Sequence, residues 1–320
     1  MSAIAERYRR FAREEAAGRS GAYETLAKCV ARSPVTLAFL DRLPTERQQP
    51  NLLFAALRLV AGMPSSVEEL DHAIDAHAEA IADVMRTRTT QTNEPGRCAA
   101  LLPSLARIEG PLALIEVGAS AGLCLLPDAY GYDWDRQKLA PPAQSGSTAP
   151  VFHCKATEDT PLPDRHSDIV WRAGLDLNPL DVSSNADVEW LETLVWPEHD
   201  ERLQNLRKAV QIAREERPRV VAGDLRKDLP ALIAEAPRDA TVVVFHTAVL
   251  SYVGERKERD AFAAAMIGDP RVIWFSNESP RTFPQFTDTA GPVFDNMFLL
   301  SVDGRPTAWT GPHGQELHWI

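Results

Sequence analysis

The chain has few cysteines, and they follow no recognisable arrangement. The four are Cys29, Cys98, Cys124 and Cys154 among 320 residues. None belongs to a Cys-x-x-Cys pair, and no histidine lies at metal-ligand spacing from any of them, which argues against a zinc site. We therefore expect no metal site, and we expect reduced, mostly buried thiols in a cytoplasmic protein.

Long apolar runs and an excess of basic charge are also missing. No stretch of about 20 uninterrupted apolar residues occurs, so no membrane span is predicted, and residues 1–10 lack the apolar segment of a signal peptide. Lys plus Arg number 34 against 45 Asp plus Glu, for a net charge of −11. That sign disfavours broad binding to a phosphate backbone. We expect a small-molecule substrate rather than nucleic acid or a membrane, and the oligomeric state stays open.

Helical patterns fill residues 1–108. Ser33 followed by Pro34 is typical of a capped helix start, and Ser66 with Glu69 forms a capping box. Residues 51–61 are apolar nearly all round, as expected of a buried helix. The sequence therefore predicts an α-helical N-terminal cap subdomain over residues 1–108.

From residue 109 onward, short apolar runs alternate with helical patterns, which is typical of an α/β domain with a mostly parallel sheet. The predicted strands cover residues 113–117, 169–175, 219–222, 241–245 and 271–275. The predicted helices cover residues 123–130, 186–194, 199–216, 229–236 and 256–267. Residues 297–320 read as a hairpin around Asp303-Gly304, and residues 134–165, rich in Pro, Ser, Asp and Gln, read as an insertion.

The most informative motif is the turn after the first predicted strand. Residues 112–126 read LALIEVGASAGLCLL. As Glu-x-Gly-x-x-x-Gly, the motif resembles the first motif of Rossmann-like S-adenosylmethionine methyltransferases. That resemblance implies a class I methyltransferase type of fold over residues 109–320 and S-adenosylmethionine as the cofactor. It places the cofactor against a set of turn residues, namely Glu116, Gly118, Ala119, Ser120 and Gly122.

Polar residues that could complete such a cofactor site follow the later predicted strands. Asp176 would accept hydrogen bonds from ribose hydroxyls, as the acid of a dinucleotide site does, and Asp224 resembles the acid that meets the adenine amine. Asp176 lies 54 residues after Gly122, whereas the dinucleotide fingerprint places its acid about 20 residues on. The insertion at residues 134–165 must account for this gap.

Further polar residues are candidates for contacts with the substrate. His246 follows a buried strand, and its pKa is tunable near neutrality, so it could orient or deprotonate the acceptor, or it could be a satisfied core histidine. Tyr252 and Asn277 are the other catalytic candidates. A polar cluster before the first strand offers substrate-binding residues, namely Asn93, Glu94 and Arg97.

The same turn also reads as Gly-x-Ser-x-Gly, the nucleophile elbow of an α/β-hydrolase. Ser120 would then be the nucleophile of an esterase, with Asp224 and either His246 or His313 completing a triad. Glu116 disfavours this interpretation because a hydrolase strand has no use for an acid there. A third alternative is a catalytically silent protein that binds a cofactor or a partner.

Nearly the whole chain resembles the bacterial family called domain of unknown function 2332. The resemblance is carried by six segments, namely residues 47–54, 86–97, 116–123, 171–182, 190–198 and 243–250. Members often carry Asn where this chain has Cys124. The family brings no established activity, so the resemblance supports the position of the motifs and implies no catalytic residue.

Overall fold

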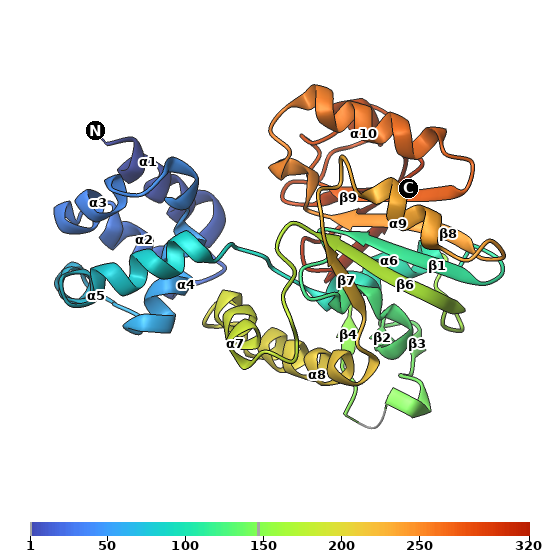
Figure 1. Ribbon diagram of the computed structural model, residues 1–320, viewed down its shortest axis with the longest axis horizontal. Coiled ribbons are helices and arrows are strands. Elements are labelled where there is room, and N and C mark those ends of the chain that lie inside the picture. The colour runs from blue at the N-terminus through green and yellow to red at the C-terminus, as the bar shows by residue number, and fades with distance from the viewer. Residues whose placement is uncertain (1, 146–147) are drawn as a thin grey trace. The chain divides into compact units, whose positions relative to one another are not determined.

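The computed structural model describes residues 2–145 and 148–320 (Figure 1). Two compact units divide the chain. Unit 1 comprises Met1–Thr92 and Asn185–Gln204, and unit 2 comprises Asn93–Ser184 and Asn205–Ile320. The helical part therefore differs from the expected span of residues 1–108, because it ends at Thr92 and gains a segment from the middle of the chain.

Unit 1 is helical. Its elements are α1 (Ala3–Phe11), η1 (Ala12–Ala16), α2 (Gly21–Val30), α3 (Pro34–Asp41), η2 (Thr45–Arg47), α4 (Pro50–Val60), α5 (Val67–Thr87), α7 (Asn185–Leu194) and the first turn of α8 (Asp200–Glu216). Both predicted caps are confirmed, since Ser33 accepts a hydrogen bond from Thr36 N and Ser66 accepts one from Glu69 N.

The helices of unit 1 pack on aromatic side chains and on a partly buried arginine, Arg58. Phe54 on α4 contacts Tyr23, whose ring also contacts Trp196. Arg58 donates hydrogen bonds to the carbonyl oxygens of Thr193 (2.7 Å) and Val195 (2.5 Å). These contacts explain why α7 and the residues after it belong to the helical unit.

Unit 2 is a mixed α/β unit built on a nine-stranded sheet in the order β5-β12-β11-β10-β9-β8-β1-β6-β7. The mutually parallel strands are β1 (Leu112–Val117), β6 (Ile169–Asp176), β7 (Arg219–Ala222), β8 (Thr241–Thr247) and β9 (Val272–Glu278). All five predicted strands are confirmed, three of them longer at their carboxyl ends. Their order, β7-β6-β1-β8-β9, reverses between β1 and β8, the kind of point at which open α/β sheets bind ligands.

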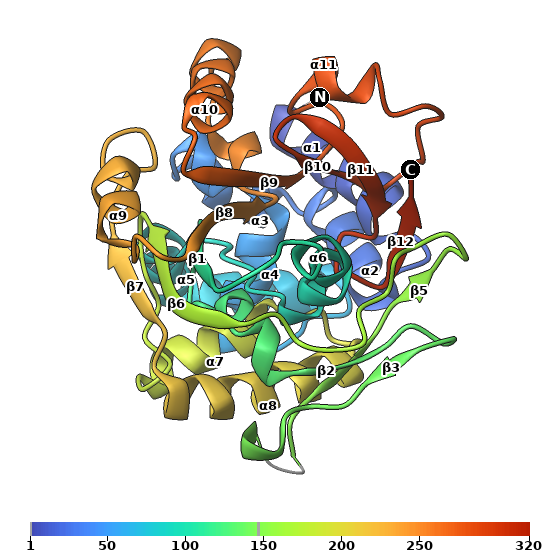
Figure 2. The ribbon, with the colours of Figure 1, turned by 90° about the vertical axis from the view of Figure 1, so that its right-hand side faces the viewer.

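The two faces of the parallel strands carry different residues because side chains alternate along a strand. One face holds an apolar core of strand residues such as Ile115 and Val244, covered by α9 (Leu229–Glu235) and α10 (Arg256–Gly268). The other face carries Glu116, which is followed by the turn. Figure 2 shows α6 (Cys98–Leu105) on the side of the sheet away from α9 and α10.

The C-terminal residues form the antiparallel edge that the hairpin prediction requires. Strand β10 (Phe298–Val302) pairs with β9 and with β11 (Arg305–Thr310) across Asp303-Gly304, and β12 (Glu316–Trp319) follows. Strand β5 (Lys155–Ala156) from the predicted insertion pairs with β12. The large sheet is therefore completed by a segment that precedes β6 in sequence.

Another part of the insertion forms a small sheet with residues 131–133, which directly precede it. It contains β2 (Gly131–Asp133), β3 (Lys138–Leu139), the 3₁₀ turn η6 (Ala143–Ser145) and β4 (Val151–His153), while residues 146–147 of the insertion lie outside the described residues. Tyr132 stacks on Trp134, whose Nε1 donates to the carbonyl oxygen of Ala99. This sheet spans residues 131–153 of the long gap between the turn and β6.

The helix predicted over residues 123–130 is wrong. Two 3₁₀ turns, η4 (Leu123–Leu125) and η5 (Pro127–Ala129), occupy the segment instead. Pro127 explains the difference, because a proline disfavours the helical conformation of the residue before it, and Leu126 has φ −114° and ψ 38°. Two short 3₁₀ turns, and not an α-helix, therefore follow the turn after β1.

An ion pair ties this segment to the sheet. Arg172 on β6 donates to both carboxylate oxygens of Asp128, at 2.7 and 2.8 Å, and to the carbonyl oxygen of Leu125. Both side chains are about one-fifth exposed. The bidentate geometry should make this pair stronger than an ordinary surface pair.

We expect Arg172→Ala to lower the free energy of unfolding of unit 2 by about 1–3 kcal/mol, between the values of exposed and buried pairs. Urea unfolding measures the change. Arg219→Ala is the matched control, because the Arg219–Glu235 pair is about half exposed and should cost about 0.5 kcal/mol. Equal losses in the two variants would contradict the structural role of Arg172.

Candidate functional site

The turn after β1 is held by hydrogen bonds from its own backbone. Gly118 N and Ala119 N both donate to the carbonyl oxygen of Leu175, and Gly122 N donates to that of Ala119. Leu123 N donates to Asn93 Oδ1 at 2.9 Å. The turn is therefore a rigid connection between β1, β6 and the segment before α6.

Gly118 and Ser120 both have left-handed backbone conformations, with φ +72° and φ +52°. A Cβ on Gly118 would lie 2.4 Å from Val249 Cγ2, so glycine is required both by its backbone and by its neighbour. Ala248, just after β8, has φ +58°. A left-handed residue other than glycine therefore follows each of the two strands at the reversal point, Ser120 after β1 and Ala248 after β8. Such conformations cluster at functional sites.

Asp176 ends β6 beside the turn, and its carboxylate is fixed by backbone groups. Oδ2 accepts from Ser120 N and Oδ1 from Asn178 N, both at 2.8 Å. The residue is 9% exposed, whereas Leu177 after it is 70% exposed. An oriented carboxylate thus lies next to an exposed apolar side chain at the carboxyl end of the strand.

Glu116 is buried at the end of β1, and its Oε2 has no hydrogen-bond partner among the described residues. Burial raises the pKa of Glu116 well above its ordinary value of 4.5, Cys124 and Asp176 raise it further, and Arg97 opposes the shift. A buried carboxyl oxygen without a partner calls for an explanation such as an ordered water or a ligand. Among the described residues, Glu116 shares this feature with Glu278 at the carboxyl end of β9, but Glu116 is the one next to the turn after β1.

The raised pKa predicts a pH effect on stability. Between pH 4.5 and the folded-state pKa, the folded protein keeps a proton that the unfolded chain has lost, so stability falls as pH rises. Glu116→Gln does not titrate, and we expect its stability relative to wild type to grow by up to about 1.4 kcal/mol per pH unit across that interval. Urea unfolding at pH 5 and pH 8 measures this. If the difference in free energy of unfolding between Glu116→Gln and wild type is the same at pH 5 and pH 8, the prediction fails. The control Glu235→Gln, at an exposed glutamate, should show no gain over wild type between the two pH values.

The three substrate-binding candidates of the polar cluster before β1 belong to unit 2 and lie around the turn. Arg97 is buried, donating through Nη1 to Thr247 O and Oγ1 (3.1 and 3.0 Å) and through Nε to the carbonyl oxygen of Pro312 (2.9 Å). Asn93 caps Leu123 N, and Glu94 accepts from Gly96 N. In this arrangement they brace the turn and β8 from inside the unit.

His246 is completely buried on the core face of the sheet. Its Nδ1 lies 2.7 Å from Glu278 Oε1, and its Nε2 lies 3.0 Å from Trp274 Nε1. Both ring nitrogens are thus engaged by protein groups, which matches the satisfied core histidine rather than a group that meets an acceptor. The other predicted catalytic residues differ from one another: Asn277 is buried and accepts from Thr310 Oγ1, and Tyr252 is 71% exposed.

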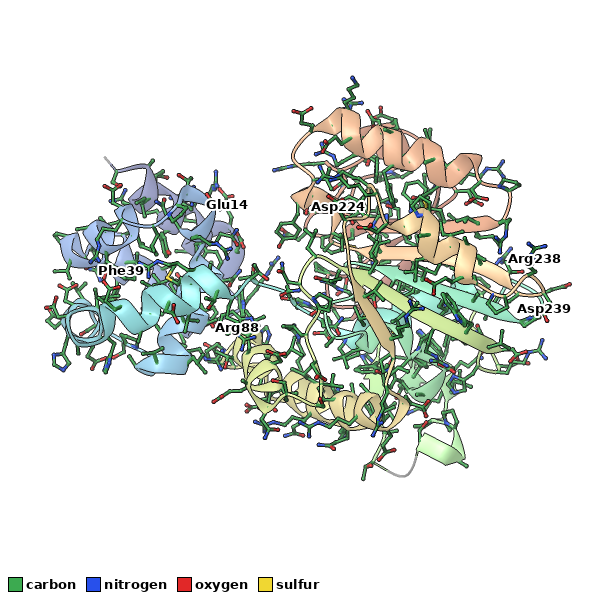
Figure 3. All side chains as sticks on the ribbon, viewed as in Figure 1. Glu14, Phe39, Arg88, Asp224, Arg238 and Asp239 are labelled. Atoms are coloured by element: carbon green, nitrogen blue, oxygen red, sulfur yellow. The ribbon has the colours of Figure 1, made fainter. Side chains whose placement is uncertain are left out.

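Asp224, labelled in Figure 3, lies just after β7 and is bound to Arg226. Hydrogen bonds from Arg226 hold the pKa of Asp224 at about 2, and Arg226 also pairs with Glu258. A carboxylate with this pKa is ionised at neutral pH. Asp224 therefore forms a partly exposed ion-pair group at the same edge of the sheet as Asp176.

Three residues of this region were not assigned a role from the sequence, namely Thr247, Val249 and Glu278. Strand alternation is the signal that identifies Glu278, because it puts Glu278, Trp274 and His246 on one face. Thr247 and Val249 gave no signal, since their roles depend on contacts with Arg97 and Gly118 from distant parts of the chain.

The hydrolase interpretation finds little support in this arrangement. Ser120 is 3% exposed, the nitrogens of His246 are taken by Glu278 and Trp274, and Asp224 is bound to Arg226. His313 lies in the turn between β11 and β12. Within residues 2–145 and 148–320, no three His, Cys, Asp or Glu side chains lie close enough together to hold a metal ion.

No helix in the described part of the chain has the length and apolar character needed to cross a membrane. A family model described as "Uncharacterized protein conserved in bacteria (DUF2332)" matches residues 5–319. No curated protein and no solved structure matches the chain.

Proposed function

Because the chain belongs to the bacterial DUF2332 family, whose description names no activity, we propose from the site alone that unit 2 binds S-adenosylmethionine and transfers its methyl group to a small molecule. In this proposal the unit is a Rossmann-like domain of class I methyltransferase type. The protein acts in the cytoplasm, which suits its four unpaired cysteines.

One observation carries the proposal. Glu116, the Gly118–Gly122 turn and Asp176 lie together at the carboxyl ends of β1 and β6, beside the strand-order reversal between β1 and β8. Ligands of open α/β sheets bind at this place, and a carboxylate after the second strand suits ribose hydroxyls. A hydrolase would use the same turn but needs a histidine at Ser120, and His246 faces the other side of the sheet.

The residues fit the cofactor in two respects. Glu116 Oε2 is a buried acceptor without a partner among the described residues, and a cofactor with donor groups would give it one. Asp176 is held in one orientation by two backbone N–H groups, so little ordering is needed when it accepts ribose hydroxyls. Asp224 stays our candidate for the adenine amine.

When bound, S-adenosylmethionine supplies an electrophilic methyl group on a sulfonium sulfur. The chain's own contribution is then to hold donor and acceptor in line, since alignment supplies a large part of the catalysis of such transfers. Exposed Leu177 and Tyr252 offer apolar contact to a ligand at this edge. We assign no general base, because both nitrogens of His246 are engaged within the core.

Thermal unfolding with a panel of ligands tests the proposal. S-adenosylmethionine and its demethylated product, S-adenosylhomocysteine, should stabilise unit 2, by about 2.7 kcal/mol at 100 times the Kd, whereas NAD and ATP should not. Stabilisation by NAD or ATP alone, or by none of the four, would contradict it. Labelling of Ser120 by a fluorophosphonate, lost in Ser120→Ala, would instead favour the esterase.

A further inference from the structure

A chain of hydrogen bonds on the core face of the sheet ends at the segment after β8. Its members are Trp274, His246 and Glu278, which are between 0% and 2% exposed. Glu278 Oε1 accepts from the backbone N–H groups of Val249 (2.8 Å) and Leu250 (3.0 Å). One carboxylate oxygen thus receives three donors, while Oε2 is buried without a partner among the described residues.

The direction of these hydrogen bonds follows from their donors. An indole N–H can only donate, so Trp274 Nε1 donates to His246 Nε2, and Nε2 carries no hydrogen. The hydrogen of the neutral ring is therefore on Nδ1, which donates to Glu278 Oε1. Because His246 is a donor here, it fixes which oxygen of Glu278 faces the backbone of Val249 and Leu250.

The segment that Glu278 holds is strained and closely packed. Ala248 has φ +58°, a conformation that persists only where surrounding contacts enforce it. Val249 lies against Gly118, with its Cγ2 2.4 Å from the position of a Cβ there. On the other face, Thr247 is held by Arg97. Residues 247–250 are thus clamped from both faces, directly beside the turn after β1.

We propose that Glu278, oriented by His246 and Trp274, is a positioning residue that holds residues 247–250 against Gly118 and so shapes the cofactor-binding edge. The effect on the cofactor-binding edge rests on the proposed function, because it requires the cofactor to bind beside this turn. Glu278 itself touches no ligand. A site whose walls are already in place binds more tightly than one that must be ordered first.

The test compares Glu278→Ala and the milder Trp274→Phe with Glu235→Ala, in which the substituted glutamate is exposed on α9. Amide hydrogen exchange of the full chain needs no ligand, and calorimetry measures the Kd for S-adenosylhomocysteine. In Glu278→Ala we expect the amides of Val249 and Leu250 to exchange at least about 10 times faster, with Ile115 unchanged, and the Kd to rise at least about 10-fold. Trp274→Phe should raise the two exchange rates and the Kd by smaller factors. Glu235→Ala should change neither the exchange rates nor the Kd.

Each outcome decides a separate point. Unchanged exchange at Val249 and Leu250 in both variants would overturn the positioning role, even if the ligand binds. Faster exchange with an unchanged Kd would overturn the link to the binding edge. If Glu278→Ala loses protection from amide exchange throughout unit 2, the variant is globally destabilised. Trp274→Phe then decides, by amide exchange at Val249 and Leu250 and by the Kd for S-adenosylhomocysteine. If wild type binds no S-adenosylhomocysteine, the proposed function fails, while the exchange data still test the clamp.

Discussion

Asp176→Ala should weaken the binding of S-adenosylhomocysteine by at least about 100-fold. The substitution removes the carboxylate that would accept the ribose hydroxyls, and hydrogen bonds to charged groups contribute about 1.5–3 kcal/mol each. It also releases Ser120 N and Asn178 N, which Asp176 now holds, so the turn loses part of its rigidity. Calorimetric titration of wild type and variant measures the difference.

Asp181→Ala is the control for this experiment. Asp181 is exposed, lies five residues further on, and also accepts a backbone N–H group, from Ser183 at 2.8 Å. The neighbouring Leu180 N donates to the carbonyl oxygen of Ser120 in the turn, whereas the Asp181 carboxylate accepts from Ser183 N. Removing the carboxylate of Asp181 should therefore change the Kd less than about 2-fold. A similar loss of affinity in both variants, or undiminished binding by Asp176→Ala, would remove Asp176 from the site.

Gly118→Ala should destabilise unit 2 by about 2–5 kcal/mol. Two costs add: a left-handed conformation costs an L residue about 1–2 kcal/mol, and overpacking a filled interior costs about 1–3 kcal/mol. Here the clash is with Val249 Cγ2 and Cγ1, at 2.4 and 2.9 Å from the new Cβ. Urea unfolding of the variant measures the sum.

Two further variants separate these costs. Gly110→Ala tests the backbone alone, because Gly110 has φ +81° with no atom within 4 Å of a Cβ, and it should cost about 1–2 kcal/mol. Adding Val249→Ala to Gly118→Ala should recover the packing cost and leave the backbone cost. A double variant no more stable than Gly118→Ala would mean that Val249 is not the residue that excludes a side chain at Gly118.

The parallel strands could be predicted because buried strands are continuous apolar runs that end in recognisable polar residues. The run Val242 to Phe245 is an example, although the strand continues to Thr247. The helix predicted after the turn was wrong because an apolar segment of this length does not distinguish a helix from 3₁₀ turns. Pro127 decides the conformation here, and its effect overrides the apolar pattern of the segment.

The position of the candidate site could be predicted, but the direction of its side chains could not. Glu116 and His246 both lie near strand ends, yet they point to opposite faces of the sheet, and only packing shows which face is covered by α9 and α10. Arg97 could be read as a substrate contact, whereas its partners Thr247 and Pro312 are about 150 and 215 residues away. Contacts over such separations leave no local pattern in the sequence.

The extent of the helical unit was unpredictable for the same reason. Residues 185–204 join unit 1 through contacts such as that of Arg58 with Thr193 O and that of Ser20 with Glu198 Oε2 at 2.6 Å. The sequence pattern changes shortly after residue 109 because the first strand, β1, begins at Leu112. The units divide at Thr92 instead, because the segment from Asn93 to Leu105 braces the turn and covers the sheet.

A crystal structure of the full chain grown with S-adenosylhomocysteine tests the central claim most directly. We predict electron density for the ligand at the carboxyl ends of β1 and β6, with its ribose on Asp176 and a donor group within hydrogen-bond distance of Glu116 Oε2. Density elsewhere on the molecule, or none at saturating ligand in crystals where no neighbouring molecule covers Leu177, would contradict the account.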